Sequence, residues 1–190
     1  MFKILNPILL LVLIFPGIKS YSQNVNDSLI YWNENKKLKW SDFQYKGPKG
    51  KLNGEDVSIS VVGISTPNSG AGYFKAYVYF SRNLSWTKDT ISVDLLEHEQ
   101  GHFDIDEIFA RRLRKYFHDY EYGIIDRIDL NKVNIIKKER NIFQNQYDFE
   151  TDHGTIPEEQ KIWNELIRQE LDKLINYKVD YTEYLKTVLV

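Results

Sequence analysis

Two histidines separated by three residues are the feature of this sequence best suited to chemistry. They occur in the run His98-Glu99-Gln100-Gly101-His102. Residues four apart lie on one face of an α-helix, so both imidazoles can reach a single zinc ion. Glu99 then points to the side of the metal, where it can take a proton from a water activated by the ion and pass it to a leaving amine. The run therefore predicts a zinc site with His98 and His102 as ligands and Glu99 as general base.

A third protein ligand is needed, because a catalytic zinc usually has three and keeps its fourth position for water. The pattern with a third histidine six residues after the second is absent, since that position is Ile108, and His118 lies too many turns along the helix. We expect His153 to be the third ligand, because Gly154 beside it lets the backbone fold back toward the motif. His153 has two other possible roles, as an exposed loop residue or as a group acting on the transition state. Nearby carboxylates are the alternative ligands: Glu150, Asp152 and Asp106.

The residues around the motif indicate how the two histidines would be held in the fold. The plain alternative to a metal site is a pair of structural histidines, but burying two unpaired imidazoles side by side is costly. Asp94 and Asp106 each lie four residues from a motif histidine, so either could accept the second N–H of a ligand, or simply lie on the solvated edge of the helix. Gly101 costs a helix about 1 kcal/mol relative to alanine, which indicates that another segment approaches closely there.

Three helices are expected in the C-terminal half. The first begins near Thr90, with Ser92 as its N-cap, and its inward stripe recurs at spacings of three and four. The second covers about 130–149, and the third, with proline in its first turn, about 157–177. The expected core residues of the three helices are Ile91, Leu95, His98, His102, Ile105, Phe109, Leu113, Val133, Ile136, Ile142, Phe143, Ile162, Trp163, Leu166, Ile167, Leu171 and Leu174.

Strands are expected before these helices. Residues 57–64 alternate apolar and polar side chains at first, and residues 73–81 are rich in aromatic residues, so the two segments predict a hairpin. A substrate held extended along a sheet edge would suit a peptidase, and residues 73–80 are the candidate edge, with plain core packing as the alternative. Strands first and helices after predict an α+β fold, with a small antiparallel sheet packed on a three-helix C-terminal half.

Composition narrows the class of protein. The chain has 190 residues, 25 Lys+Arg against 27 Asp+Glu, and no cysteine. Near-cancelling charges argue against nucleic-acid binding, and the absence of cysteine leaves His, Asp and Glu as metal ligands. Residues 1–22 have the charge, apolar run and small residues of a signal peptide. We therefore expect residues 23–190 to be a single exported domain, periplasmic or secreted, without stable membrane insertion.

Three segments of the chain resemble a known family. They are Leu38-Lys39-Trp40-Ser41-Asp42-Phe43, the core segment 95–105 with the H-E-x-x-H motif, and Tyr147-Asp148-Phe149-Glu150-Thr151-Asp152-His153-Gly154, with Gln160 and Trp163 after them. In these residues the chain resembles the exported bacterial domain of unknown function that is known as a predicted secreted zinc-dependent protease. The resemblance implies a zincin-like metalloprotease whose site combines the helix motif with the later His-Gly segment, which supports His153 as a site residue.

The function expected from these observations is a zinc-dependent metallopeptidase acting on a peptide or protein. Two alternatives remain open. Glu99–His102 and Glu150–His153 form two E-x-x-H units, as in di-iron carboxylate bundles. The chain could also be a non-catalytic binding module stabilised by zinc. Four tyrosines are candidates for stabilising an oxyanion: Tyr120, Tyr122, Tyr147 and Tyr181.

Overall fold

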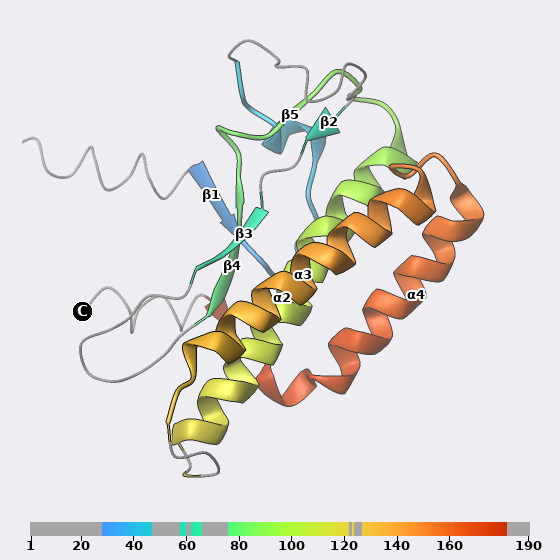
Figure 1. Ribbon diagram of the computed structural model, residues 1–190. Coiled ribbons are helices and arrows are strands. Elements are labelled where there is room, and N and C mark those ends of the chain that lie inside the picture. The colour runs from blue at the N-terminus through green and yellow to red at the C-terminus, as the bar shows by residue number, and fades with distance from the viewer. Residues whose placement is uncertain are drawn as a thin grey trace, which may run out of the picture.

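The fold has an α+β layout, as the sequence predicts, with short strands in the N-terminal half and three helices after them (Figure 1). The computed structural model describes residues 28–46, 58–59, 62–65, 76–121, 123 and 127–181. The expected signal peptide, residues 1–22, lies outside these ranges. No helix in the described part is both long and apolar enough to cross a membrane.

The strands form two antiparallel sheets. In the larger sheet β1 (Leu29–Tyr31) and β3 (Val62–Ser65) both pair with β4 (Tyr77–Ser81), giving the order β1-β4-β3. In the smaller sheet β2 (Ser58–Ile59) pairs with β5 (Trp86–Thr87). The expected hairpin is confirmed by the β3–β4 pair, although the first expected strand divides between the two sheets.

The proposed substrate-binding edge is wrong. Residues 77–81 form the central strand of the larger sheet, with both sides already hydrogen-bonded to β1 and β3. Val78 and Phe80 point into the core and are fully buried. Core packing therefore explains Phe80, whereas Tyr77 and Tyr79 are only partly buried and residues 73–75 lie outside the described ranges.

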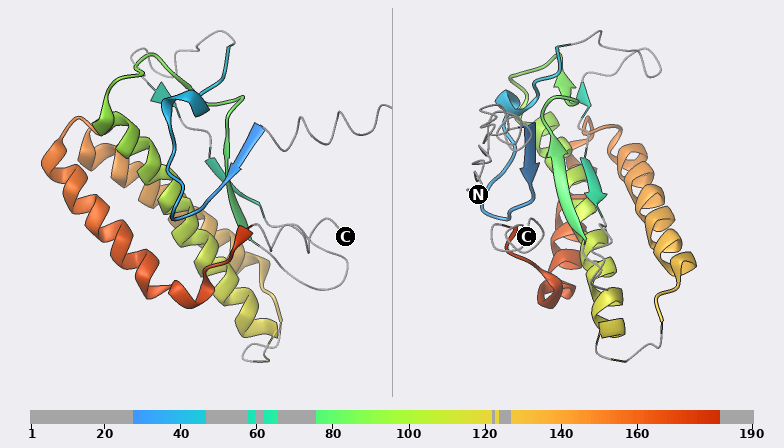
Figure 2. Two further views of the ribbon diagram at one scale, coloured as in Figure 1. Left: turned by 180° about the vertical axis from the view of Figure 1, so that it is seen from behind. Right: turned by 90° about the vertical axis from the view of Figure 1, so that its left-hand side faces the viewer.

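Helix α2 (Val93–Glu121) is the central element and carries the H-E-x-x-H motif. Its N-cap is Ser92, whose Oγ accepts a hydrogen bond from Leu95 N at 3.1 Å, as expected. Buried Ile105, Phe109 and Leu113 lie on its inward stripe, whereas Ile91, before the helix, is 87% exposed and is wrongly placed in the expected core. The helix packs against the larger sheet, α3 and α4 (Figure 2).

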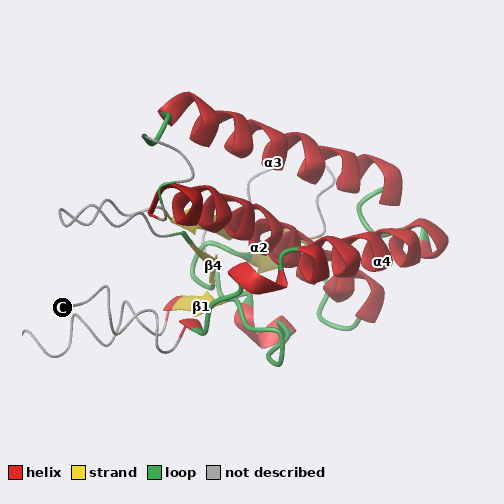
Figure 3. Cartoon of the chain, turned by 90° about the horizontal axis from the view of Figure 1, so that it is seen from below, coloured by secondary structure: helices red, strands yellow, loops and turns green. Residues whose placement is uncertain are grey.

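Helices α3 (Leu130–Thr151) and α4 (Pro157–Lys173) complete the domain, followed by the short 3-10 helix η2 (Ile175–Tyr177). Seen from below, α2 lies between α3 and the strands (Figure 3). Two expected core residues are wrong, because Ile142 and Ile162 are 65% and 61% exposed. Other expected core residues are confirmed, because Val133, Ile136, Trp163 and Ile167 are buried, and Tyr147 joins them.

Candidate metal centre

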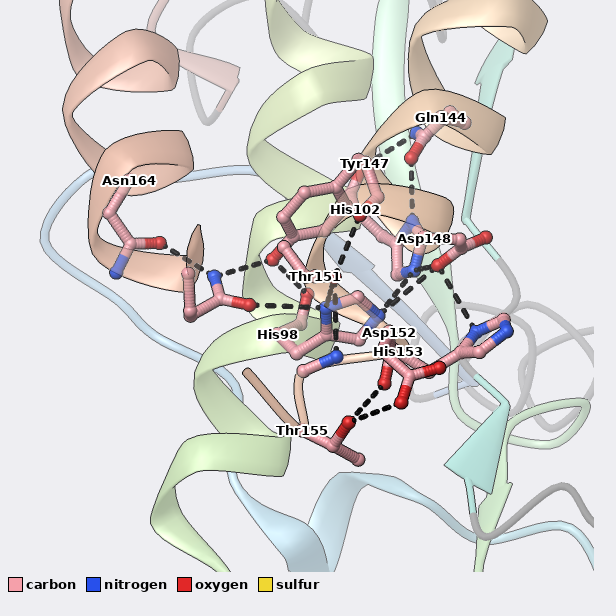
Figure 4. A network of polar contacts seen from close by, with 12 residues as sticks. His98, His102, Gln144, Tyr147, Asp148, Thr151, Asp152, His153, Thr155 and Asn164 are labelled. Carbon is pink, nitrogen blue, oxygen red and sulfur yellow. Dashed lines mark hydrogen bonds and ion pairs between the residues drawn. The ribbon is translucent and has the colours of Figure 1, made fainter. Parts of the chain in front are cut away.

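The two motif histidines meet on the face of α2 that packs against α3. Their Nε2 atoms are 3.2 Å apart, and their rings are nearly perpendicular, with centroids 4.7 Å apart (Figure 4). The His98 side chain is 3% exposed and that of His102 is 16% exposed. The helical spacing therefore brings the two imidazoles together as the sequence predicts.

Asp148 on α3 supplies a third potential ligand atom, which the sequence motif did not predict. Its Oδ1 lies 2.9 Å from Nε2 of His102 and 3.2 Å from Nε2 of His98. A signal was present in the sequence, because Gln144, Tyr147, Asp148 and Thr151 recur at spacings of three and four and form one face of α3. That face carries no apolar side chain except the tyrosine ring, which marks it as a site rather than a core stripe.

His153 reaches the same carboxylate from a turn after α3. Asp152, His153 and Gly154 are consecutive residues with positive φ, at 47°, 54° and 81°. This left-handed run reverses the chain and places Nδ1 of His153 3.5 Å from Oδ1 of Asp148, with a side chain that is 73% exposed. Strained backbone of this kind concentrates at functional sites. His98, Asp148 and His153 together could hold a metal ion.

Hydrogen bonds on the far side of each ring set the tautomers. Nδ1 of His98 lies 3.2 Å from Oε1 of Gln160, and Nδ1 of His102 lies 2.6 Å from Oε1 of Gln144. Because both partners are acceptors, each Nδ1 carries a proton, which leaves each Nε2 to face Asp148 and to bind either a proton or a metal ion.

Three potential ligand atoms therefore converge: two Nε2 atoms and one carboxylate oxygen. Their separations are 2.9–3.2 Å. Ligand atoms bound tetrahedrally at about 2.0–2.1 Å from zinc lie about 3.3 Å from one another, so the donor set fits the ion in chemistry and in spacing. Such a cluster needs a cation at its centre, either a metal ion or a proton.

The charges of Asp148 and its neighbours shift the pKa values in this cluster. Burial lowers the pKa of His102, but the hydrogen bond and charge of Asp148, together with the charge of Glu99, outweigh burial and raise the pKa to about 9. Burial acts to raise the pKa of Asp148, but hydrogen bonds from His102 and His98 hold it well below its usual range. The site is thus electronegative and favours a bound cation.

Glu99 is buried beside the cluster. The residue is 4% exposed, and its charge acts on both His102 and Tyr147. Within the described ranges its carboxylate has no hydrogen bond or ion pair. Its oxygens are not among the fully buried, unpartnered polar atoms of the described residues, so they keep contact with solvent. A carboxylate that no described donor holds, next to two imidazoles, favours a functional role.

Tyr147 explains the glycine of the motif. A Cβ at residue 101 would lie 2.6 Å from Cζ of Tyr147, which confirms the expected close approach. The Tyr147 hydroxyl donates to the carbonyl of His98 at 3.0 Å and accepts from Nε2 of Gln160 at 2.7 Å.

These two hydrogen bonds hold the Tyr147 hydroxyl inside the core, so it does not stabilise an oxyanion. The Tyr181 hydroxyl is likewise committed to Glu107, Tyr122 lies outside the described residues, and Tyr120 lies in the last turn of α2.

The alternative carboxylate ligands are engaged elsewhere. Glu150 accepts hydrogen bonds from Trp163 and Gln146, so only His153 of the second E-x-x-H unit approaches the cluster. Asp152 accepts from Thr155. Asp94 is exposed, and Asp106 contacts His102 only through Gln144.

No protein-family model matches this sequence, and neither a curated protein nor a solved structure is significantly similar to it. The resemblance to the exported zinc-protease family therefore rests on the residues of this chain and stays a prediction.

Proposed function

We propose that this chain is an exported zinc-dependent metallopeptidase. The observation that carries the proposal is the convergence of three potential ligand atoms, from His98, His102 and Asp148, next to a glutamate, Glu99, whose carboxylate no described donor holds. In this assignment Asp148 is the third ligand, because its Oδ1 lies 2.9–3.2 Å from both imidazoles, whereas the more exposed His153 is 3.5 Å from Asp148 and meets His98 only through its ring edge.

In the proposed hydrolysis the zinc ion and the protein side chains have different roles. When bound, zinc would polarise the scissile carbonyl and lower the pKa of water near neutrality. Glu99 accepts the proton of the attacking water and returns it to the leaving amine.

The exposed side of the site receives the substrate. His98 and Glu99 are almost fully buried, so the approach to the cluster is past Asp148 and His153, whose side chains are 29% and 73% exposed. His153 stands at this opening, where its imidazole can donate a hydrogen bond to the carbonyl under attack. A flexible or unfolded peptide segment fits this approach better than a folded surface, because the two ligands from α2 lie below the surface.

The test is a Glu99→Gln variant of the mature chain. We expect it to retain zinc, since Glu99 is not a ligand, and to lose hydrolysis of a mixed peptide library by at least about 100-fold. Glu97→Gln is the matched control, because Glu97 is an exposed residue of the same helix turn. Hydrolysis by Glu99→Gln at the control rate would remove Glu99 from the mechanism. A wild-type protein that binds zinc and cleaves no peptide would favour the zinc-stabilised binding module.

A further inference from the structure

Each motif imidazole is contacted by one glutamine, and the two glutamines come from different helices. Gln144 on α3 faces Nδ1 of His102, and Gln160 on α4 faces Nδ1 of His98. Both glutamines are buried, at 8% and 2% exposure. The histidines of α2 are therefore each held from behind by a neutral side chain of a neighbouring helix.

The orientation of each amide is fixed by its other contacts. The amide nitrogen of Gln144 donates to the carbonyl of His102 at 3.0 Å and to Oδ1 of Asp106 at 2.8 Å. Both of these partners are acceptors only, so a turned amide would set its oxygen against two oxygens. The oxygen of Gln144 must therefore face the imidazole of His102.

Gln160 is held in the same manner. Its amide nitrogen donates to the hydroxyl oxygen of Tyr147 at 2.7 Å and to Oδ1 of Asn164 at 2.8 Å. The Tyr147 hydroxyl has already given its proton to the carbonyl of His98, so it can only accept here. The oxygen of Gln160 is thus left to face Nδ1 of His98.

We propose that Gln144 and Gln160 are positioning residues that fix the Nδ1–H tautomer of His102 and His98 and so present both Nε2 lone pairs to the metal. The inference rests on the proposed zinc site. Carboxylates commonly hold metal-binding histidines in this way. Amides give the same acceptor oxygen without adding negative charge beside Glu99 and Asp148, where two further buried anions would be costly.

The positioning role of Gln144 and Gln160 can be tested by measuring the zinc affinity of the full mature chain. Gln144→Leu and Gln160→Leu should each weaken zinc binding about 10- to 100-fold, measured by competition with a chromophoric chelator. The matched control is Gln146→Leu, because Gln146 is an exposed glutamine of α3 that bonds only to Glu150. Leucine variants that bind zinc as tightly as the control would overturn the proposal.

A second variant distinguishes the effect of the acceptor oxygen on zinc affinity from the effect of general packing. Gln160→Glu keeps an oxygen facing His98. The Asn164 amide and the Tyr147 hydroxyl can each turn to donate to the other oxygen, the hydroxyl by releasing the carbonyl of His98. The zinc affinity of Gln160→Glu should therefore exceed that of Gln160→Leu by at least about 5-fold. Equal affinities would show that the oxygen of Gln160 does not position the ring.

Imidazole ¹⁵N spectra read the tautomers directly and without reference to hydrolysis. We expect Nδ1 of both rings to be protonated in the zinc-loaded wild type, and the His98 ring to show the same tautomer in the metal-free protein. An unprotonated Nδ1 on the His98 ring of the metal-free wild type would overturn the inference even if zinc binds. Zinc binding with the expected tautomers but without peptide hydrolysis would contradict the proposed function and leave the role of the glutamines standing.

Discussion

The backbone of Gly154 packs directly on His98: a Cβ at residue 154 would lie 2.6 Å from Cβ of the histidine. Gly154 also has a φ of +81°, which side chains rarely adopt. Its N–H donates to Oγ1 of Thr151, which in turn lies 3.4 Å from Nδ1 of His98. The turn that follows α3 is therefore fastened to the first ligand of the motif as well as to Asp148.

Gly154→Ala should destabilise the fold and disturb the metal site. The positive φ costs about 1–2 kcal/mol for alanine, and the overlap with His98 adds about 1–3 kcal/mol. Gly123→Ala is the matched control, because Gly123 has a φ of +69° with nothing within 4 Å of its Cβ position. Urea unfolding of both variants isolates the contact. Equal losses of stability would show that only backbone conformation matters.

A buried ion pair supports the glutamine behind His102. Asp106 has no exposed surface, and Arg140 binds it with Nε at 2.6 Å and Nη2 at 2.9 Å. Arg140→Met leaves this carboxylate with Gln144 alone among its described partners, and should cost about 3–5 kcal/mol in the free energy of unfolding. The double variant Asp106→Asn/Arg140→Met should recover part of this loss. Denaturation of the metal-free proteins checks the prediction, and a loss below about 1 kcal/mol for Arg140→Met would refute it.

Tyr181 ties the end of the described chain to the centre of the domain. Its hydroxyl donates to Oε2 of Glu107 at 2.8 Å and accepts from the N–H of Val78 at 3.0 Å. Burial and the charge of Glu107 raise the pKa of Tyr181 well above its ordinary value. Tyr181→Phe should therefore destabilise the fold by about 1–3 kcal/mol at neutral pH, because two buried polar groups each lose a partner.

The cost of Tyr181→Phe should depend on pH. Above about pH 10 the unfolded chain releases the tyrosine proton whereas the folded chain keeps it, so the stability due to this group is complete below pH 10 and falls as pH rises toward the folded pKa. The difference in unfolding free energy between wild type and variant should narrow from pH 9 to about pH 11. A constant difference over this range would contradict the raised pKa.

Local signals explain why the helices and the two motif histidines could be predicted. Ser92 caps its helix through a contact three residues away, and His98 and His102 meet because helical spacing alone places them on one face. The close approach at Gly101 was also predictable, since glycine in a helix interior is unfavourable unless a neighbour needs the space.

The remaining features depend on contacts between distant segments. Strand β1 has three residues and exists through its pairing with β4, about 50 residues later, so no local periodicity marks it. Asp148 becomes a site residue because α3 packs antiparallel against α2, a relationship that no spacing within either helix reveals. The exposure of Ile142 and Ile162 has the same origin, since helix packing selects which apolar face is covered.

The metal content of the purified mature protein tests the central claim most directly, measured by elemental analysis beside Asp148→Ala and His153→Ala. We predict one zinc per chain in the wild type, loss of zinc in Asp148→Ala, and retention in His153→Ala. Zinc lost from His153→Ala and kept by Asp148→Ala would reinstate His153 as the third ligand. A wild-type protein that binds no metal would mean that a proton alone joins His98, His102 and Asp148, and it would contradict the metallopeptidase account.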